Sequence, residues 1–158
     1  MQFVKQSARK KVLFVCLGNA CRSPMAEAIA SRLAADVIEA SSAGLTPLGR
    51  VELLTTETLA RNGYHPAGLE SKPIAIEESQ SADIIVNMSG WPKAAAFDDP
   101  AKVEDWYVED PYGADAEVYQ RIFEDIERRV AKLADRLRNT EITRAPTRNT
   151  KGKGIGKP

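Results

Sequence analysis

A cysteine and an arginine with five residues between them stand in the run VCLGNACRSP, at residues 15–24. The apolar, β-branched stretch at residues 11–15 predicts a buried strand, and residues 23–28 predict the start of a helix. A short loop between a strand and a helix N-terminus gathers backbone N–H groups and the positive end of the helix dipole, which favours a bound anion. Such a loop also favours the thiolate form of a cysteine. The run therefore predicts a nucleophile, Cys16, in a phosphate-sized loop with a bidentate cation, Arg22.

A carboxyl group far along the chain is a candidate partner for this nucleophile. Asp110 begins the tripeptide Asp110-Pro111-Tyr112 and lies 94 residues after Cys16 (110 minus 16). The carboxyl ends of parallel strands, where such sheets bind ligands, would bring Cys16 and Asp110 together.

Strand and helix signals alternate along the chain. The expected strands cover residues 11–15, 37–40, 83–88 and 103–108. The expected helices cover residues 23–35, 49–62, a short segment near 91–97, and a long last helix whose apolar residues recur from Val118 to Leu137. Ser23 and Asp115 are expected helix caps, and residues 41–44 are an expected turn. The pattern predicts an α/β fold: a single three-layer domain, a four-stranded parallel sheet with helices on both faces, and a phosphate loop after the first strand.

The composition limits the class of protein. A length of 158 residues favours one domain. No apolar stretch approaches the ~20 residues that span a bilayer, and residues 1–11 lack the apolar core of a secretory signal. We therefore expect a cytoplasmic location and no membrane partner. The chain has two cysteines, Cys16 and Cys21, within one loop, which excludes a disulfide framework.

The formal net charge is zero, but the charges are distributed unevenly. Residues 98–117 contain eight acidic side chains and one lysine, whereas residues 140–158 contain five basic side chains and one glutamate. The basic end is too poor in apolar residues to order itself. We therefore expect a folded domain over residues 1–139 and a basic, disordered tail over residues 140–158. Contact of the tail with nucleic acid or acidic lipid is the less favoured interpretation, so no nucleic-acid partner is expected.

Together, the Cys16–Arg22 loop and the Asp110-Pro111-Tyr112 tripeptide resemble the low-molecular-weight protein tyrosine phosphatase family. The resemblance covers most of residues 11–138 and includes Gly18 and Ser23 of the loop. It implies hydrolysis of phosphotyrosine or aryl phosphate monoesters through a phospho-cysteine intermediate, with no metal and no cofactor. It also implies a phosphotyrosine protein or a small aryl phosphate as substrate, with inorganic phosphate as a competitor.

The resemblance implies a role for each matching residue. Cys16 is the nucleophile, Arg22 grips two phosphate oxygens, and Asp110 is the general acid. Ser23 donates its hydroxyl to the Cys16 sulfur and eases its departure. The residues expected to bind phosphate or substrate, chiefly through backbone amides, are Leu17, Gly18, Asn19, Ala20, Cys21, Ser23 and Tyr112. Tyr112 is the aromatic wall beside the substrate ring, and Ser41 and Ser42 brace the loop.

Two positions depart from the family pattern. Gly113 stands where relatives often have a second tyrosine, so a phosphorylation switch is not expected there. Leu69 falls where many relatives have a histidine that supports the loop asparagine, and the single histidine, His65, lies four residues earlier. His65 is expected at the surface. The support that this histidine gives the loop asparagine in relatives is therefore not expected here, whereas the nucleophile, the phosphate loop and the acid are unaffected.

Two other functions stay open at this point. Thioredoxin-coupled arsenate reductases, which share this fold and loop, pass electrons through further cysteines outside the loop, and this chain has none there. A non-catalytic phosphate-binding module would bind phosphate without turnover. Cys21 also has two interpretations, a reversible disulfide with Cys16 or a small residue packed beside the loop. The acidic segment 98–117 has two interpretations. It is a solvated face or, as a hypothesis, a surface that favours substrates with basic residues beside the phosphotyrosine.

Overall fold

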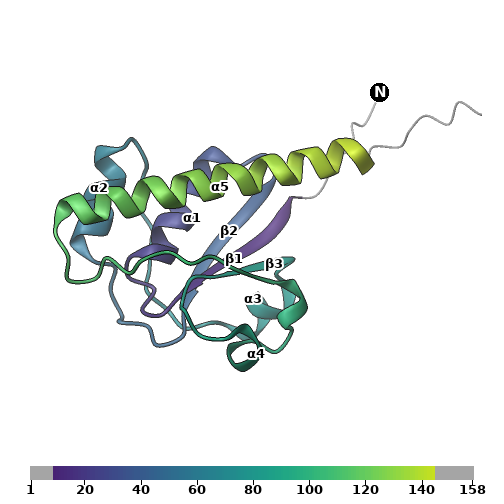
Figure 1. The fold of residues 1–158 in the computed structure, drawn as a ribbon, viewed down its shortest axis with the longest axis horizontal. Coiled ribbons are helices and arrows are strands. Elements are labelled where there is room, and N and C mark those ends of the chain that lie inside the picture. Colours follow the sequence, from purple (N-terminus) through teal and green to yellow (C-terminus); the bar gives the residue numbers. More distant parts are fainter. Residues whose placement is uncertain (1–8, 145–158) are drawn as a thin grey trace, which may run out of the picture.

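The computed structural model describes residues 9–144 and has a four-stranded parallel sheet with helices on both faces (Figure 1). Its elements, in chain order, are β1 Lys10–Cys16, α1 Arg22–Leu33, β2 Ile38–Gly44, α2 Leu53–Arg61, α3 Ile76–Ser81, β3 Ile84–Asn87, α4 Lys93–Ala96, the 3-10 helix η1 Pro100–Lys102, β4 Val103–Asp105 and α5 Ala116–Arg144. The predicted fold class is confirmed, including the loop directly after β1.

The order of the strands places the functional loops at one edge of the sheet. The order is β2-β1-β3-β4, and each neighbouring pair is parallel. From β1 the chain continues to β2 at one edge of the sheet, whereas from β3 it continues to β4 at the opposite edge. Such a reversal opens a crevice at the carboxyl ends of the two central strands, and ligands bind there in open α/β sheets. The segments that follow Cys16 and Asn87 border this crevice.

Alternating side chains of the strands fill two separate cores. Phe14 and Val86 face one side of the sheet, where α1, α2 and α5 cover them. Leu13, Val15 and Ile85 face the other side and pack against the ends of the short helices α3 and α4. Both faces of the sheet are therefore buried, which explains why β1 is apolar at every position from Val12 to Cys16.

Strand β2 is longer than the sequence predicts. Residues 41–44, expected as a turn, continue the strand and pair with β1 up to Cys16 and Gly44. Close packing against the loop explains the glycine at position 44. A Cβ on Gly44 would lie 2.9 Å from the amide nitrogen of Asn19 and from the Leu17 carbonyl oxygen. Pairing with the central strand extends β2 here, although glycine and serine are typical of turns.

The helix starts differ in two places. Helix α1 begins at Arg22 and its N-cap residue, Cys21, has no side-chain capping bond. Ser23 is therefore not a cap, and its hydroxyl is bonded elsewhere. The Asp115 cap is confirmed, since the amide of Val118 donates to its Oδ1 at 3.1 Å. Helix α3 was not predicted, because its six residues are mostly polar and exposed.

Helix α5 continues to Arg144, so the expected boundary at residue 139 lies inside a helix. The rest of the predicted tail, residues 145–158, lies outside the described residues, as do residues 1–8. Its disorder stays a prediction. Within residues 9–144, no helix combines the length and the hydropathy needed to cross a membrane.

Candidate active site

The phosphate loop, residues 17–21 between β1 and α1, turns most of its carbonyl groups toward the surrounding protein. Hydrogen bonds from neighbouring segments reach the carbonyl oxygens of Cys16, Leu17, Gly18, Ala20 and Cys21. In the part of the chain that the structure describes, the amides of residues 17–21 donate to no protein acceptor. Asn19 has a left-handed conformation, with φ of 48°. Donors without protein partners on a bent loop form a nest that suits an anion.

The Cys16 thiol lies at the end of β1 and is buried. Its Sγ is 3.0 Å from the Oγ of Ser23. The Nδ2 of Asn19 donates to that Oγ at 2.8 Å. Because a thiolate can only accept a hydrogen bond, the Ser23 hydroxyl is the donor whenever Cys16 is ionised. Ser23 therefore stands where it can stabilise a negative sulfur.

A chain of polar side chains braces the loop from beneath. Asn19 donates from Nδ2 to the Oγ of Ser42 at 3.1 Å, and Ser42 donates to the Oε1 of Glu27 at 2.5 Å. The backbone amide of Lys72 donates to the Oδ1 of Asn19 at 2.9 Å. Burial raises the pKa of the Glu27 carboxyl above its ordinary value, opposed by the Ser42 hydrogen bond. Leu69 packs against the core, so Ser42 and the Lys72 amide hold the asparagine without a histidine.

The expectation that Ser41 also braces the loop is not met. Side chains alternate along β2, so Ser42 is paired with Phe14 on the face toward α1 while Ser41 is paired with Leu13 on the opposite face. Among residues 9–144, no hydrogen bond links the Ser41 side chain to the loop. The sequence could not separate two adjacent serines without the register of the strand.

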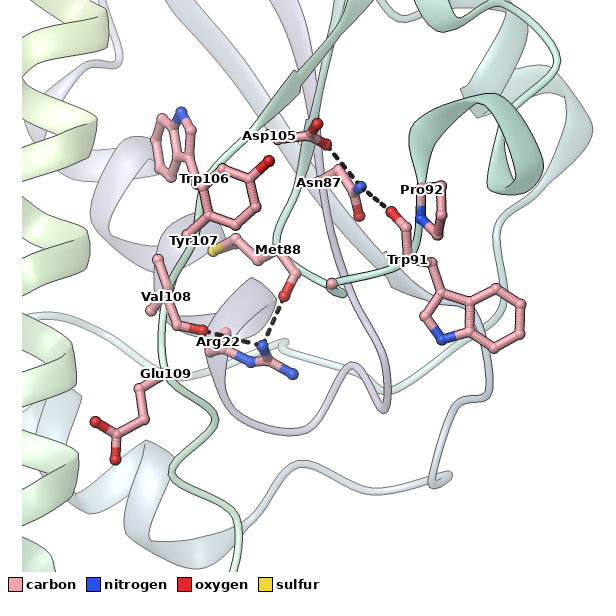
Figure 2. A pocket seen from close by; sticks show the side chains of 11 residues that line it. Arg22, Asn87, Met88, Trp91, Pro92, Asp105, Trp106, Tyr107, Val108 and Glu109 are labelled. Atoms are coloured by element: carbon pink, nitrogen blue, oxygen red, sulfur yellow. Dashed lines mark hydrogen bonds between the residues drawn. The ribbon is translucent and has the colours of Figure 1, made fainter.

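The guanidinium of Arg22 is buried beside the loop and fixed on one edge. Its Nη1 donates to the carbonyl oxygens of Met88 at 2.6 Å and Val108 at 3.2 Å, as Figure 2 shows. Its Nη2 lies 3.4 Å from the Oδ2 of Asp110. Its Nε is buried and has no partner among the described residues. The Nε–Nη2 edge is therefore oriented for a planar, bidentate oxyanion.

Asp110 is held by a turn of its own tripeptide. Its Oδ1 accepts a hydrogen bond from the amide of Tyr112 at 3.1 Å, and Pro111 is buried. The amide of Ala114 donates to the Pro111 carbonyl at 2.8 Å, with Gly113 at φ of 83° between them. A turn with positive φ at this position requires glycine. This explains why Gly113 occupies the place of a tyrosine.

The predicted residues meet at a cavity of about 270 Å³, here called the site cavity. Cys16, Arg22, Asp110 and Tyr112 line it together with the loop. Its rim is apolar, since the exposed side chains of Leu17, Leu48 and Tyr112 border it. Thr46 and Leu48 were not predicted, because no local signal marks a residue that contacts the loop from beyond β2. An anion-binding floor beneath an apolar rim suits a phosphate group attached to a flat, apolar body.

Cys21 packs under the loop. Its Sγ is 3.3 Å from the hydroxyl oxygen of Tyr119, and burial raises the pKa of its thiol. Cys16 and Cys21 are both free thiols. The contact with Tyr119 fits the interpretation of Cys21 as a packed small residue.

Several further residues of the site were not predicted. Glu27 ends the chain of braces, Thr55 donates to the Ala20 carbonyl at 2.8 Å, and Ser71 donates to the Gly18 carbonyl at 3.0 Å. Thr55 and Ser71 come from distant segments, and Glu27 of α1 acts on the loop through Ser42 of β2, so the fold is needed to bring these groups together. Within the described chain, no group of three or more histidine, cysteine, aspartate or glutamate residues is arranged to hold a metal ion.

Comparison with known proteins matches this geometry. The family model described as low molecular weight phosphotyrosine protein phosphatase matches residues 11–143. A glutaredoxin arsenate reductase of Synechocystis sp. is 32% identical, over 81% of this chain and 98% of its own length. The arginine phosphatase of Geobacillus stearothermophilus has a TM-score of 0.78 at 25% identity, covering 85% of this chain and 97% of its own. A low molecular weight protein tyrosine phosphatase from T. tengcongensis has a TM-score of 0.74 at 30% identity, with coverage of 81% and 99%.

Proposed function

Because this chain belongs to the low molecular weight phosphotyrosine protein phosphatase family, we propose that it hydrolyses phosphotyrosine and aryl phosphate monoesters through a phospho-cysteine intermediate. Its relatives bear three different activities in their names, arsenate reduction and the dephosphorylation of arginine and of tyrosine. The substrate must therefore be argued from the residues of this site.

One observation supports the phosphoryl chemistry most strongly. The buried Nε of Arg22 and the amides of residues 17–21 have no described protein partner, and both border the site cavity beside Cys16. A buried donor without a partner, such as the Nε of Arg22, costs free energy, typically about 1–3 kcal/mol. A phosphate group would satisfy this Nε and the loop amides together. They would hold its equatorial oxygens in the transition state as well as in the ground state.

The proposed reaction has two steps. Cys16 attacks phosphorus in line with the leaving oxygen, and Asp110 donates a proton to that oxygen as the P–O bond breaks. Water then attacks the phospho-cysteine, Asp110 takes its proton, and the P–S bond breaks to release phosphate and the thiolate. The Ser23 hydroxyl, 3.0 Å from the sulfur, stabilises the departing thiolate. Arg22 holds the phosphoryl oxygens throughout.

The rim of the site cavity supports an aryl leaving group. Leu17, Leu48 and Tyr112 present exposed apolar surface around the opening. A phenyl ring would bury its faces against these side chains while its phosphate reaches the loop, and aromatic contacts of this kind contribute about 0.5–1.5 kcal/mol beyond area burial.

Phosphoarginine is the second candidate substrate. The arginine phosphatase named above has a TM-score of 0.78 with this chain. The carboxylate of Asp110 stands beside Arg22 at the mouth of the cavity, where it could also pair with a second, substrate guanidinium. A guanidinium lacks the apolar ring faces that the rim suits, so we rank phosphotyrosine first.

Arsenate reduction has less support. A reductase needs a thiol that attacks the Cys16–arsenic adduct, and within the chain the one other thiol is Cys21, so any further thiol would have to come from another molecule. Its sulfur is buried against the Tyr119 hydroxyl, and burial raises its pKa, which lowers its thiolate fraction.

Hydrolysis of matched phosphotyrosine and phosphoarginine peptides, and thiol-dependent reduction of arsenate, would test this assignment. We expect the highest kcat/KM for the phosphotyrosine peptide and no arsenate reduction. Faster hydrolysis of phosphoarginine would transfer the assignment to that substrate. Tight binding of phosphate without turnover of either peptide would show a binding module.

A further inference from the structure

A second cavity, the side cavity, adjoins the proposed phosphate site and has a volume of about 530 Å³ (Figure 2). Arg22 lines both cavities. The segment 105–109 lines the side cavity and continues directly into Asp110, which lines the site cavity. A substrate bound through its phosphate would therefore have the side cavity next to it.

Two exposed aromatic side chains border the side cavity from different segments. Trp91, after β3, is 53% exposed, and Tyr107, after β4, is 81% exposed. Figure 2 shows them on opposite sides of the opening. Large aromatic side chains left exposed around a hollow mark a surface for contact, and their ring faces attract cations.

A carboxylate without a cationic partner lines the same cavity, beside Asn87 (Figure 2). Asp105 lines the cavity and is half-buried. Its neighbours in the acidic segment are ion-paired, Glu104 with Arg136 and Glu109 with Arg121, whereas no ion pair of Asp105 exists among residues 9–144. A half-buried carboxylate with no counter-ion favours a cationic ligand more than a fully solvated one does.

The carboxylate and one aromatic wall are fixed by a common residue. The buried Asn87 donates from Nδ2 to the Oδ1 of Asp105 at 2.8 Å and to the Trp91 carbonyl at 2.9 Å. Its Oδ1 accepts hydrogen bonds from the amide and the hydroxyl of Ser89, at 3.1 and 2.6 Å. The cavity is thus pre-organised, which lowers the entropy lost when a ligand binds.

The basic side chains near this segment are directed elsewhere. The Nζ of Lys102 donates to three carbonyl oxygens at the end of α3, including that of Ser79 at 2.7 Å. The Nζ of Lys93 lies 3.4 Å from the Val103 carbonyl. The Nη1 of Arg22, on the edge of the guanidinium that faces the side cavity in Figure 2, donates to two backbone carbonyl oxygens. Among the described residues, Arg22 is the one basic residue that lines this cavity, and none of these three side chains pairs with Asp105.

We propose that the side cavity binds a lysine or arginine side chain of the phosphorylated polypeptide, near the phosphorylated residue. The cationic head pairs with Asp105, and the exposed side chains of Trp91 and Tyr107 border the cavity that holds the ligand. Asp105 and Asp110 are five residues apart, at most about 17 Å along an extended chain. The basic residue therefore stands within about five positions of the phosphorylated one. The inference rests on the proposed function, since it names the substrates of that same site.

Binding of phosphotyrosine peptides to the Cys16→Ser protein would test this subsite without turnover. One peptide has alanine at all flanking positions, and the others have a single lysine at each position from five residues before to five residues after the phosphotyrosine. We expect lysine on one side to lower Kd about three- to tenfold relative to the alanine peptide. The same ratio should fall to about one when Asp105→Asn or Trp91→Ala is added. It should persist with Asp98→Asn, which removes a carboxylate of the same acidic segment that does not line the cavity.

A Kd ratio near one at every lysine position would overturn the subsite, as would a preference that survives both Asp105→Asn and Trp91→Ala. Hydrolysis of para-nitrophenyl phosphate by the unaltered protein separates the two proposals. Turnover of this small substrate without a lysine preference would reject the subsite alone. No turnover, with a lysine preference in binding, would reject the enzyme and retain the subsite.

Discussion

The Nη1 atom of Arg22 donates to the main-chain carbonyl of Met88 at 2.6 Å, which ties the helix after β1 to the segment after β3. A second hydrogen bond from Nη1, to the Val108 carbonyl, ties the same helix to the segment after β4. One edge of the guanidinium is thereby used to orient the other edge toward the site cavity. The arrangement requires a planar, forked cation, which a lysine cannot supply.

Replacement of this arginine should therefore be severe even though charge is retained. We expect Arg22→Lys to lower kcat/KM for para-nitrophenyl phosphate by roughly 10²–10³-fold, the usual effect of losing an oxyanion donor. The matched control is Arg121→Lys, a surface arginine paired with Glu109, which should stay within about twofold of the unaltered protein because exposed pairs contribute little. A loss of less than tenfold in Arg22→Lys would contradict the proposed role of the fork.

The Ser23 hydroxyl is expected to act mainly in the second step. Its donor lies 3.0 Å from the Cys16 sulfur, so Ser23→Ala should slow breakdown of the phospho-cysteine more than its formation. Stopped-flow measurements should show a burst of one nitrophenolate per site followed by a kcat lowered roughly tenfold to a hundredfold. Ser81→Ala, an exposed serine at the end of α3, is the control. A slower burst at unchanged steady-state rate would place Ser23 in the first step instead.

The loss of rate on replacing Asp110 should depend on how much protonation the leaving group needs. Asn cannot deliver a proton, so Asp110→Asn should lower kcat/KM for phenyl phosphate, which reports the step that expels the leaving group, by about 10²-fold or more. The loss should be smaller for para-nitrophenyl phosphate, whose leaving group needs little protonation. Asp99→Asn, an exposed carboxylate of the same acidic segment, should leave both rates unchanged. Equal losses for both substrates would speak against Asp110 as the acid.

The carboxyl group of Glu27 should make the stability of the folded protein depend on pH. Burial raises the pKa of its carboxyl above the ordinary value of 4.5. Its contribution to stability is therefore present below pH 4.5 and is lost as pH rises through the raised pKa. Glu27→Gln stays neutral and can still accept from Ser42, so it should be at least as stable as the unaltered protein at pH 8.

Urea unfolding at pH 5 and pH 8 measures this effect. The loss of unfolding free energy between the two pH values should be smaller in Glu27→Gln than in the unaltered protein. Glu27→Ala, which leaves the Ser42 hydroxyl without its acceptor, should be destabilised at both pH values. A Glu27→Gln protein clearly less stable than the unaltered one at pH 8 would show that the charge itself holds the brace.

The sequence was sufficient for the parts of the site that lie in one stretch of chain. Cys16, Arg22 and the loop between them could be predicted because a strand, a short loop and a helix start are local features. Asp110 could be predicted because a proline and a tyrosine follow it directly. The glycine at position 113 looked like a departure until its φ of 83° showed that the turn requires it.

The braces could not be predicted, because they depend on register and on distant segments. The choice between Ser41 and Ser42 is a matter of which face of β2 each occupies, and that is set by pairing with Leu13 and Phe14. The Lys72 amide and the Glu27 carboxyl carry no sequence signal for contact with the loop. The side cavity likewise appears only when the segments after β3 and β4 lie side by side.

Capture of the phospho-enzyme tests the central claim most directly. The reduced protein would be mixed with para-nitrophenyl phosphate, quenched within milliseconds, digested and analysed by mass spectrometry, beside Cys16→Ser. We predict one phosphoryl group on the peptide that contains Cys16, formed as fast as nitrophenolate is released, and no steady turnover in Cys16→Ser. Turnover that continues in Cys16→Ser, or turnover by the unaltered protein with no phosphoryl group on Cys16, would contradict the account.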